Sequence, residues 1–294
     1  MTRPLTISLV VAGLLLSAQN PYRAEIEKWR RTREENLKKD DGWLTVAGLF
    51  WLQEGENRVG TNESARIVLP KGSVPARVGS FILAGGKTKF VAERGVPVTS
   101  AGKLIESLEM RPDTPGPPDI ISIKGLSMFV IKRGAMFGIR LRDVNSSFRR
   151  EFTGLRWFPV DKSWQIQARF VPYRPPKQIP VLDIIGNTEQ QPCPGYAAFT
   201  IAGKEYRLEP VAEGKRLFFM FRDQTAGKET YPSGRFMYSD APRDGRVVLD
   251  FNRAYNPPCA FTPYATCPLP PPQNRLAVRI PAGEMVYHHS QSGK

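Results

Sequence analysis

The stretch Asp250–Arg275, DFNRAYNPPCAFTPYATCPLPPPQNR, is the part of the chain that most constrains the fold. It holds seven prolines. Each proline fixes φ and removes a backbone donor, so residues 256–272 can form neither a helix nor a central strand. A loop this long in a compact domain is usually a lid, a binding loop or a disordered linker. Phe261, Tyr264, Leu269 and two cysteines give it apolar groups to bury, so we expect a stiff, ordered loop that shapes a cleft.

Away from this loop, short runs of alternating apolar and polar residues are separated by glycine-rich and proline-rich turns. This pattern is typical of antiparallel sandwiches and barrels, and not of βαβ units. We therefore predict an all-β fold of two antiparallel β-lobes, as sandwich or curled barrel, joined near residues 143–159. The expected strands are 43–52, 65–69, 78–84, 88–92, 104–110, 120–124, 128–132, 136–142, 164–171, 180–185, 197–201, 205–211, 217–222, 235–238, 247–251, 276–280 and 284–287.

One segment, residues 20–39, has a helical period. Tyr22, Ile26 and Trp29 recur at the spacing of one helix face. Arg33 interrupts that face. If the helix packs across a sheet, Arg33 needs a buried carboxylate or backbone carbonyls, because an unpaired buried charge is costly. The sequence predicts one N-terminal helix with a buried partner for Arg33.

The first 20 residues are typical of an export signal. Arg3 lies in a short positive region, and residues 7–16 form an apolar run that is too short to span a bilayer as a mature helix. An uncleaved N-terminal anchor is the alternative, and either form places the body of the protein in the periplasm or outside the cell. No later apolar stretch is long enough for a membrane span. The predicted divisions are 1–20 (signal), 21–145 (helix and first lobe), 146–289 (second lobe with the proline-rich loop) and 290–294 (tail).

The formal net charge is +14. A charge of this sign favours anionic partners such as acidic glycans, phosphorylated molecules or headgroups, although a solvated basic surface with no specific partner is the alternative. Nucleic acid is disfavoured, because the chain carries an export signal and its basic residues are spread along it. Arg140, Arg142, Asp143, Arg149 and Arg150 form a second charged cluster near the joint, a candidate anion site or a solvated edge.

The chain has three cysteines, Cys193, Cys259 and Cys267. In an oxidising compartment the simplest expectation is a Cys259–Cys267 disulfide that closes the loop, with Cys193 free and buried. Metal ligation is the rival, but seven intervening residues differ from the short spacing of zinc sites and no histidine lies near. We expect no metal and no cofactor.

At both ends the chain resembles a family of bacterial and archaeal proteins known only as a domain of unknown function. The resemblance rests on residues 29–60 and 221–284, with GIRLRD at 138–143 and GLRWFPVD at 154–161 between them. It implies no activity. It implies that one pattern links Tyr231, Arg235, Asp250, Asn252, Tyr255, Asn256, Cys259, Cys267 and Asn274. The cysteines also resemble those of cytoplasmic members, which argues against the disulfide.

Histidine is confined to His288 and His289, in a polar tail. A Ser-His-Asp or Cys-His hydrolase needs an imidazole held against its nucleophile, which a frayed tail does poorly. Asp250 and Asn252 occupy alternate positions at the end of an expected strand and so face one side. Glu284 could supply a second carboxylate, and paired carboxylates suit glycoside hydrolysis.

The leading hypothesis is an exported protein that binds a small polar or anionic ligand, with carbohydrate as one candidate, in a cleft under residues 256–272. The alternatives are a glycosidase-like hydrolase that uses Asp250 and Glu284, and a structural or docking protein of the cell envelope with Phe261 and Tyr264 exposed. A network that only braces the loop is the plainest alternative. The candidate ligand-binding residues are Tyr231, Arg235, Asp250, Asn252, Tyr255, Asn256 and Asn274.

Overall fold

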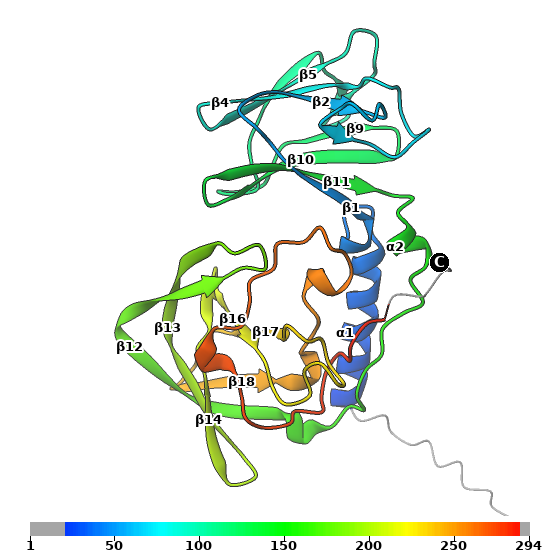
Figure 1. The fold of residues 1–294 in the computed structure, drawn as a ribbon. Coiled ribbons are helices and arrows are strands. Elements are labelled where there is room, and N and C mark those ends of the chain that lie inside the picture. Colours follow the sequence, from blue (N-terminus) through cyan, green and yellow to red (C-terminus); the bar gives the residue numbers. More distant parts are fainter. Residues whose placement is uncertain (1–20, 289–294) are drawn as a thin grey trace, which may run out of the picture.

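The structure is a computed structural model that describes residues 21–288. The predicted export signal, His289 and the predicted tail lie outside the described residues. The described chain is mostly β, with one long N-terminal helix and two antiparallel β-lobes (Figure 1). The predicted fold class is confirmed. The division at residue 145 into domains stays a prediction.

The first lobe is a sandwich of two sheets, ordered β1-β11-β10-β9-β6-β7 and β3-β2-β4-β5-β8. Its pairs are antiparallel except β2 with β3. The core between the sheets includes Phe81, Phe90, Val130 and Ile139, all fully buried. The strands are β1 (Val46–Trp51), β2 (Gly55–Gly60), β3 (Ile67–Val68), β4 (Gly79–Ala84), β5 (Lys87–Ala92), β6 (Thr99–Ser100), β7 (Lys103–Leu104), β8 (Ser107–Met110), β9 (Ile120–Ile123), β10 (Leu126–Arg133) and β11 (Met136–Asp143).

The second lobe has sheets ordered β14-β13-β12-β18 and β15-β16-β17. Strand β17 contacts β18 and β15 contacts β13, so the sheets meet at both edges and curl around a shared interior. Phe219, Phe221 and Leu249 fill one end of that interior, and Val181, Met220 and Cys193 fill the other. The strands are β12 (Gln165–Leu182), β13 (Thr188–Ile201), β14 (Lys204–Leu208), β15 (Val211–Glu213), β16 (Arg216–Phe221), β17 (Arg235–Asp240) and β18 (Arg246–Asp250).

Strand β12 is continuous where the sequence predicted two strands, 164–171 and 180–185. It pairs with β18 only over residues 165–169, so beyond this point one of its edges lacks a ladder partner. Prolines are tolerated there because no donor is needed on the open edge. The register with β13 also shifts between Pro172 and Lys177, which absorbs the proline run.

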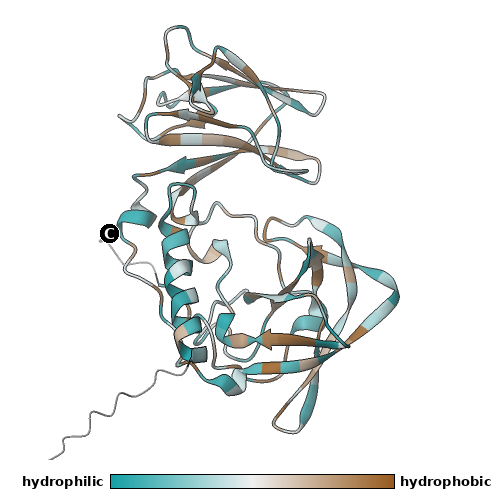
Figure 2. Ribbon diagram, turned by 180° about the vertical axis from the view of Figure 1, so that it is seen from behind, coloured by the Kyte–Doolittle hydropathy of each residue, from teal (hydrophilic) through white to brown (hydrophobic). Residues whose placement is uncertain are grey.

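The helix α1 (Pro21–Lys38) runs along the second lobe before the chain enters the first (Figure 1). It is mostly hydrophilic along its length (Figure 2), and only Ile26 and Leu37 are buried. Polar side chains therefore make many of its long-range contacts. Arg30 donates to the carbonyl of Phe158 at 2.9 Å, and Arg33 donates to Glu284 at 3.2 Å. The predicted buried partner of Arg33 is confirmed.

The proline-rich loop, residues 256–272, is ordered and lies at the end of the second lobe that faces the first (Figure 1). It contains one 3-10 turn (Pro258–Ala260), and a second (Pro272–Asn274) begins at its end. Gly234 packs tightly on it: φ is +104°, and a Cβ there would lie 2.6 Å from Pro270 Cγ. The loop is thus held by backbone contacts as well as by its side chains.

Several local predictions were wrong. Residues 276–280 and 284–287 form no strand, and the latter has only an isolated bridge from Glu284 to Trp157. Residues 43–45 form a 3-10 turn before β1. Strands β2 and β6 and the short helix α2 (Ser147–Arg150) were missed, because each is short or weakly patterned.

Candidate functional site

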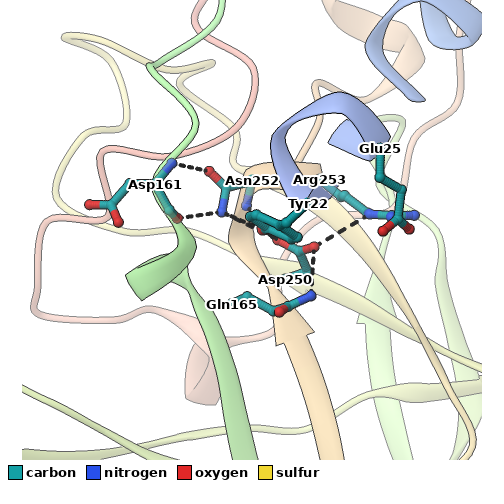
Figure 3. Close-up of polar contacts among 7 residues, drawn as sticks. All are labelled: Tyr22, Glu25, Asp161, Gln165, Asp250, Asn252 and Arg253. Atoms are coloured by element: carbon teal, nitrogen blue, oxygen red, sulfur yellow. Dashed lines mark hydrogen bonds and ion pairs between the residues drawn. The ribbon is translucent and has the colours of Figure 1, made fainter. Parts of the chain in front are cut away.

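Asp250 and Asn252 lie at the root of the proline-rich loop, in a closed network (Figure 3). The Asp250 carboxylate accepts the backbone N–H of Asn252 at 3.2 Å and the Tyr22 hydroxyl at 2.8 Å. Asn252 is fully buried; its amide donates to the Tyr22 hydroxyl at 2.9 Å and to the Asp161 carbonyl at 2.8 Å, and its oxygen accepts the Asp161 N–H at 3.1 Å. The prediction that both lie on one strand face was wrong. Asp250 ends β18 and caps a 3-10 turn (Phe251–Arg253) that contains Asn252.

Asn274 and Arg235 are also internal braces. The fully buried Asn274 side chain accepts from the Glu209 N–H and donates to the Glu209 carbonyl, both at 2.8 Å, and donates to the Met220 carbonyl at 2.9 Å. Arg235, 1% exposed, pairs with Asp223 at 3.3 Å and donates to the carbonyls of Ile280 and Ala282. Burial lowers the pKa of Arg235, and Asp223 opposes that shift.

Glu284 is fully buried and pairs with Arg33, not with Asp250. Burial raises the pKa of the Glu284 carboxyl, against the lowering effect of Arg33. Arg33 also donates to the Asn256 carbonyl at 2.9 Å and lies over the Tyr255 ring at 4.5 Å, and the Asn256 amide donates to the Met285 carbonyl at 2.8 Å. The structure therefore does not bring the two candidate catalytic carboxylates together: each contacts a different turn of α1.

Cys259 and Cys267 meet, as the disulfide prediction required, but both are free thiols. The Cys259 N–H donates to Cys267 Sγ at 3.1 Å, and Tyr231 donates to the Cys259 carbonyl at 3.1 Å. The expected disulfide is therefore not formed in this structure. Cys193 is free and fully buried, as predicted.

The predicted ligand-binding residues therefore form several separate networks rather than one open cleft. The docking alternative also loses its main feature, because Phe261 is 0% exposed and packs with Leu37 and Leu44. The plainest expectation, a network that braces the loop, describes these residues best.

A cavity of about 440 Å³ lies elsewhere on the loop, where the two lobes face one another. Thr266 and Pro268 form its wall on the loop side. The rest comes from the hairpin ends of β10–β11 and β12–β13, from the strands β15 and β16, and from Asp113 and Thr114 in the segment between β8 and β9. Its floor is apolar, because Val181, Val211 and Met220 belong to the interior of the second lobe. The full lining is Asp113, Thr114, Lys132, Arg133, Val181, Asp183, Asn187, Glu189, Gln191, Val211, Ala212, Glu213, Phe218, Met220, Thr266 and Pro268.

Backbone and side-chain contacts hold this cavity in shape. The Leu269 N–H donates to the Leu182 carbonyl at 2.7 Å, and the Ile184 N–H donates to the Cys267 carbonyl at 2.9 Å. From the first lobe, Arg133 donates to the Thr266 hydroxyl at 2.8 Å, and Nη2 of Arg140 reaches the same oxygen at 3.3 Å. The cavity wall thus has contacts from both lobes.

The charged groups of the cavity are mostly acidic. Arg133 makes a two-pronged pair with Asp113, at 2.8 and 3.0 Å. Glu213 accepts the Tyr238 hydroxyl at 2.6 Å, and burial, followed by this hydrogen bond, raises the pKa of Tyr238. Within residues 21–288 no cluster of three or more His, Cys, Asp and Glu side chains is arranged to hold a metal ion.

Residues 150–285 match the sequence family described as Protein of unknown function (DUF1684). This part of the chain is a DUF1684 region. The resemblance to a domain-of-unknown-function family is confirmed for these residues. No curated protein matches the chain.

Among solved structures, an uncharacterized protein of Haloarcula marismortui is 32% identical, over 47% of this chain and 78% of its own, with a TM-score of 0.40. An FHA domain from work on phosphothreonine-dependent FHA interactions is 17% identical, over 32% of this chain and 92% of its own, with a TM-score of 0.23. The FhaA FHA domain, complexed with an intracellular domain, is 17% identical, over 32% and 97%, with a TM-score of 0.23. All three TM-scores are low, so these likenesses assign no function.

The DUF1684 region supplies the floor and one wall of the cavity. The first lobe supplies the opposite wall, from the β10–β11 hairpin and the segment between β8 and β9. The cavity does adjoin the proline-rich loop, where the sequence predicted a cleft, but none of the predicted ligand-binding residues lines it. The available signal was the polar hairpin end IIGNTEQQ, residues 184–191, in which Asn187, Glu189 and Gln191 alternate. No helix within residues 21–288 is both long and apolar enough to cross a bilayer.

Proposed function

We propose that this protein binds a small amphipathic molecule, with an apolar body and a cationic or neutral polar group, in the cavity between the lobes. The observation that carries the proposal is a cavity of about 440 Å³ with an apolar floor and a rim rich in carboxylates. Ligand sites commonly have roughly 300–1,000 Å³ and lie at domain junctions or barrel mouths.

The local charge favours a cationic or neutral ligand over the anionic one that the whole-chain charge suggested. Among the lining residues, Arg133 and Asp113 neutralise one another. The remaining charged residues of the lining are one cation, Lys132, and three carboxylates, Asp183, Glu189 and Glu213. Charges beyond roughly 8–10 Å are screened at physiological ionic strength, so the lining outweighs the distant basic surface.

The floor of the cavity determines which apolar group the ligand can carry. Phe218 and Met220 offer a ring face and a flexible thioether, and both suit an aromatic or branched apolar group. Met220 is 1% exposed, so such a group would replace solvent next to the lobe interior. Burial of a phenyl-sized group there would contribute roughly 1.5–3 kcal/mol.

Four matched probes test the proposal: phenethylammonium, neutral 2-phenylethanol, anionic phenylacetate and glucose, each titrated into the whole protein and followed by NMR shifts. We expect saturable binding of the first two, with the cation tighter, and none of phenylacetate. Tighter binding of phenylacetate or glucose, or no saturable binding by any probe, would contradict the proposal.

Two variants localise the binding. Ala212 is an exposed residue on the rim, so Ala212→Trp should block the cavity without disturbing the core. Ala84→Trp, at an exposed strand end of the first lobe, is the matched control and should bind as the parent does. Equal loss in both variants would place the binding elsewhere.

We also propose that the protein acts outside the cytoplasm, on the strength of the apolar run at residues 7–16. Mass spectrometry of the protein from fractionated cells tests this. The expected result is an exported form that has lost about 18–20 residues, as the sequence pattern of a cleaved signal implies. Full-length protein confined to the cytoplasm would contradict it.

A further inference from the structure

Cys259 and Cys267 lie next to one another although seven residues separate them. The backbone N–H of Cys259 donates to Cys267 Sγ at 3.1 Å, which places the second sulfur over the first residue. Cys259 lies within the proline-containing turn Pro258–Ala260. The segment between the two cysteines is tied to the first lobe by the Thr262 hydroxyl, which donates to the Val46 carbonyl at 2.9 Å. The loop therefore holds the two thiols together without a covalent bond.

A buried cation without an anionic partner lies beside this pair. Arg140 is 4% exposed, makes no ion pair among residues 21–288, and its Nε has no hydrogen-bond partner in that part of the chain. Its guanidinium lies 5.1 Å from the centre of the Trp43 ring and 3.3 Å from the Thr266 hydroxyl. Burial, and then the neighbouring cation Arg133, lower the pKa of Arg140 to about 10. The charge of Asp113 and, to a smaller extent, the charge of Cys267 oppose that shift.

The two sulfurs differ in acidity. A hydrogen bond from the Cys267 thiol lowers the pKa of Cys259 against the effect of burial. The same contact and burial raise the pKa of Cys267. The pair therefore loses its first proton at Cys259 and holds the second one tightly. A thiolate here would also give Arg140 the negative charge that it lacks.

The two cysteines also differ in solvent exposure, in the direction that makes Cys259 the more reactive one. Cys259 is half-buried, so a small reagent has some access to it, whereas Cys267 is 3% exposed. Cys193 is fully buried, and burial raises its pKa to about 11. Reactive cysteines lie in electropositive, partly exposed surroundings, and structural cysteines do not. Only Cys259 of the three combines access with a lowered pKa.

We propose that Cys259 and Cys267 are a redox-active dithiol, which a small-molecule disulfide converts reversibly to an intramolecular disulfide. The Cys259 thiolate attacks one sulfur of the small disulfide, and the other sulfur leaves as a thiolate that takes up a proton. Cys267 then loses its proton and attacks the Cys259 sulfur of the mixed disulfide, releasing the second small thiol. The protein loses two hydrogens, and one disulfide is reduced to two thiols.

The proposed dithiol does not depend on ligand binding in the cavity, although the two residues next to Cys267 line the cavity wall. Cys267 lies between Thr266 and Pro268, which line the cavity, so the bond would fix that segment of the wall. The sequence alone suggested a permanent structural disulfide. The structure favours a reversible one, because the free thiols are already held in contact and one is activated.

Equilibration of the whole protein in buffers with varied ratios of oxidised to reduced glutathione tests the proposal. After acid quenching, iodoacetamide alkylation and peptide mass spectrometry report which cysteines are bonded. We expect a Cys259–Cys267 link that rises and falls with the ratio, while Cys193 stays free. A link that forms only in denaturant, or no link at any ratio, would overturn the proposal.

Serine variants separate the two roles. Cys267→Ser should trap glutathione on Cys259, because no resolving thiol remains, whereas Cys259→Ser should bind little glutathione. Cys193→Ser is the matched control and should form the link as the parent does. Equal glutathione adducts on Cys259 and Cys267 would contradict the assignment of Cys259 as the nucleophile.

A separate measurement tests the role of Arg140. The rate of Cys267 alkylation against pH, measured on the Cys259→Ser background, should move to higher pH in Arg140→Gln and return in Arg140→Lys, because Arg140 lowers the pKa of Cys267. At a pH below the pKa of the thiol, raising that pKa by about 1 lowers the thiolate fraction, and with it the alkylation rate, about tenfold. If both Arg140 variants keep the parent profile, the cation does not activate the pair.

Discussion

Arg133, in the hairpin of the first lobe, donates from Nε to the hydroxyl of Thr266 in the proline-rich loop at 2.8 Å. The same guanidinium is fixed by its pair with Asp113, and Arg140 reaches the same hydroxyl at 3.3 Å. One threonine oxygen thus accepts from two cations that belong to the other lobe. This contact ties the loop to the first lobe at the edge of the cavity.

We expect Thr266→Val to lower the free energy of unfolding by about 1–3 kcal/mol, because valine fills the same space but leaves two donors without their acceptor. Urea unfolding of the whole protein measures the loss. Thr200→Val, at an exposed position of β13, is the matched control and should change stability by less than about 0.5 kcal/mol. Equal effects in both variants would show that the Thr266 hydroxyl does not join the lobes.

Asn274→Ala should be among the most destabilising single changes. The side chain is fully buried and satisfies three backbone groups, two on Glu209 and one on Met220. Each buried group left without a partner costs about 1–3 kcal/mol, so we expect a loss of about 3–5 kcal/mol in total. Its exposed neighbour supplies the control: Gln273→Ala, assayed by the same urea curve, should cost less than about 1 kcal/mol.

Stability should depend on pH through Glu284. Burial raises its pKa in the folded state, so the folded protein binds the proton more tightly than the unfolded chain does. The stability that this proton contributes is present below the unfolded value, near 4.5, and is lost as pH rises through the higher folded value.

Glu284→Gln should therefore unfold with a flatter dependence on pH above 4.5 than the parent, as thermal melts across a pH series will show. Glu229→Gln is a control of opposite sign. Its hydrogen bond with Arg279 lowers the pKa of Glu229, so that carboxylate stabilises above its ordinary value and loses its effect as pH falls. A parental slope in Glu284→Gln would mean that Glu284 is not the group that titrates.

Tyr22→Phe should loosen the start of α1. The hydroxyl donates to Asp250 at 2.8 Å and accepts from Asn252 at 2.9 Å, and a hydrogen bond to a charged group is worth about 1.5–3 kcal/mol. We expect a loss near the lower figure, because Asp250 keeps Arg253 and the backbone N–H of Asn252. Tyr206→Phe, which removes only a long 3.5 Å contact, should leave the melting temperature nearly unchanged.

The sequence predicted what depends on local pattern. The helix of residues 20–39 follows from its period, and the need of Arg33 for a buried partner follows from its place on the apolar face. The antiparallel lobes follow from the alternating runs and their turns. The ordered loop follows from seven prolines flanked by apolar groups.

The candidate site could not be predicted from local sequence patterns, for two physical reasons. Asp250 uses its carboxylate to cap the turn that follows β18, so Asn252 leaves the strand. The two side chains then meet in an internal network with Tyr22 and do not face an open cleft. The cavity, in turn, gathers residues from Asp113 to Pro268 that share no local motif. Their proximity depends on how two lobes and one loop pack, and no single segment encodes it.

The helix α1 contacts residues that are synthesised long after it. The partners of Arg33, Asn256 and Glu284, lie 223 and 251 residues further along the chain, and Glu284 sets the longer interval. At ~5–20 residues per second, synthesis of that interval takes roughly 12–50 s. An isolated helix of 18 residues with a mostly polar surface is marginal in water, so through that time the segment stays open to any other partner that can bind it.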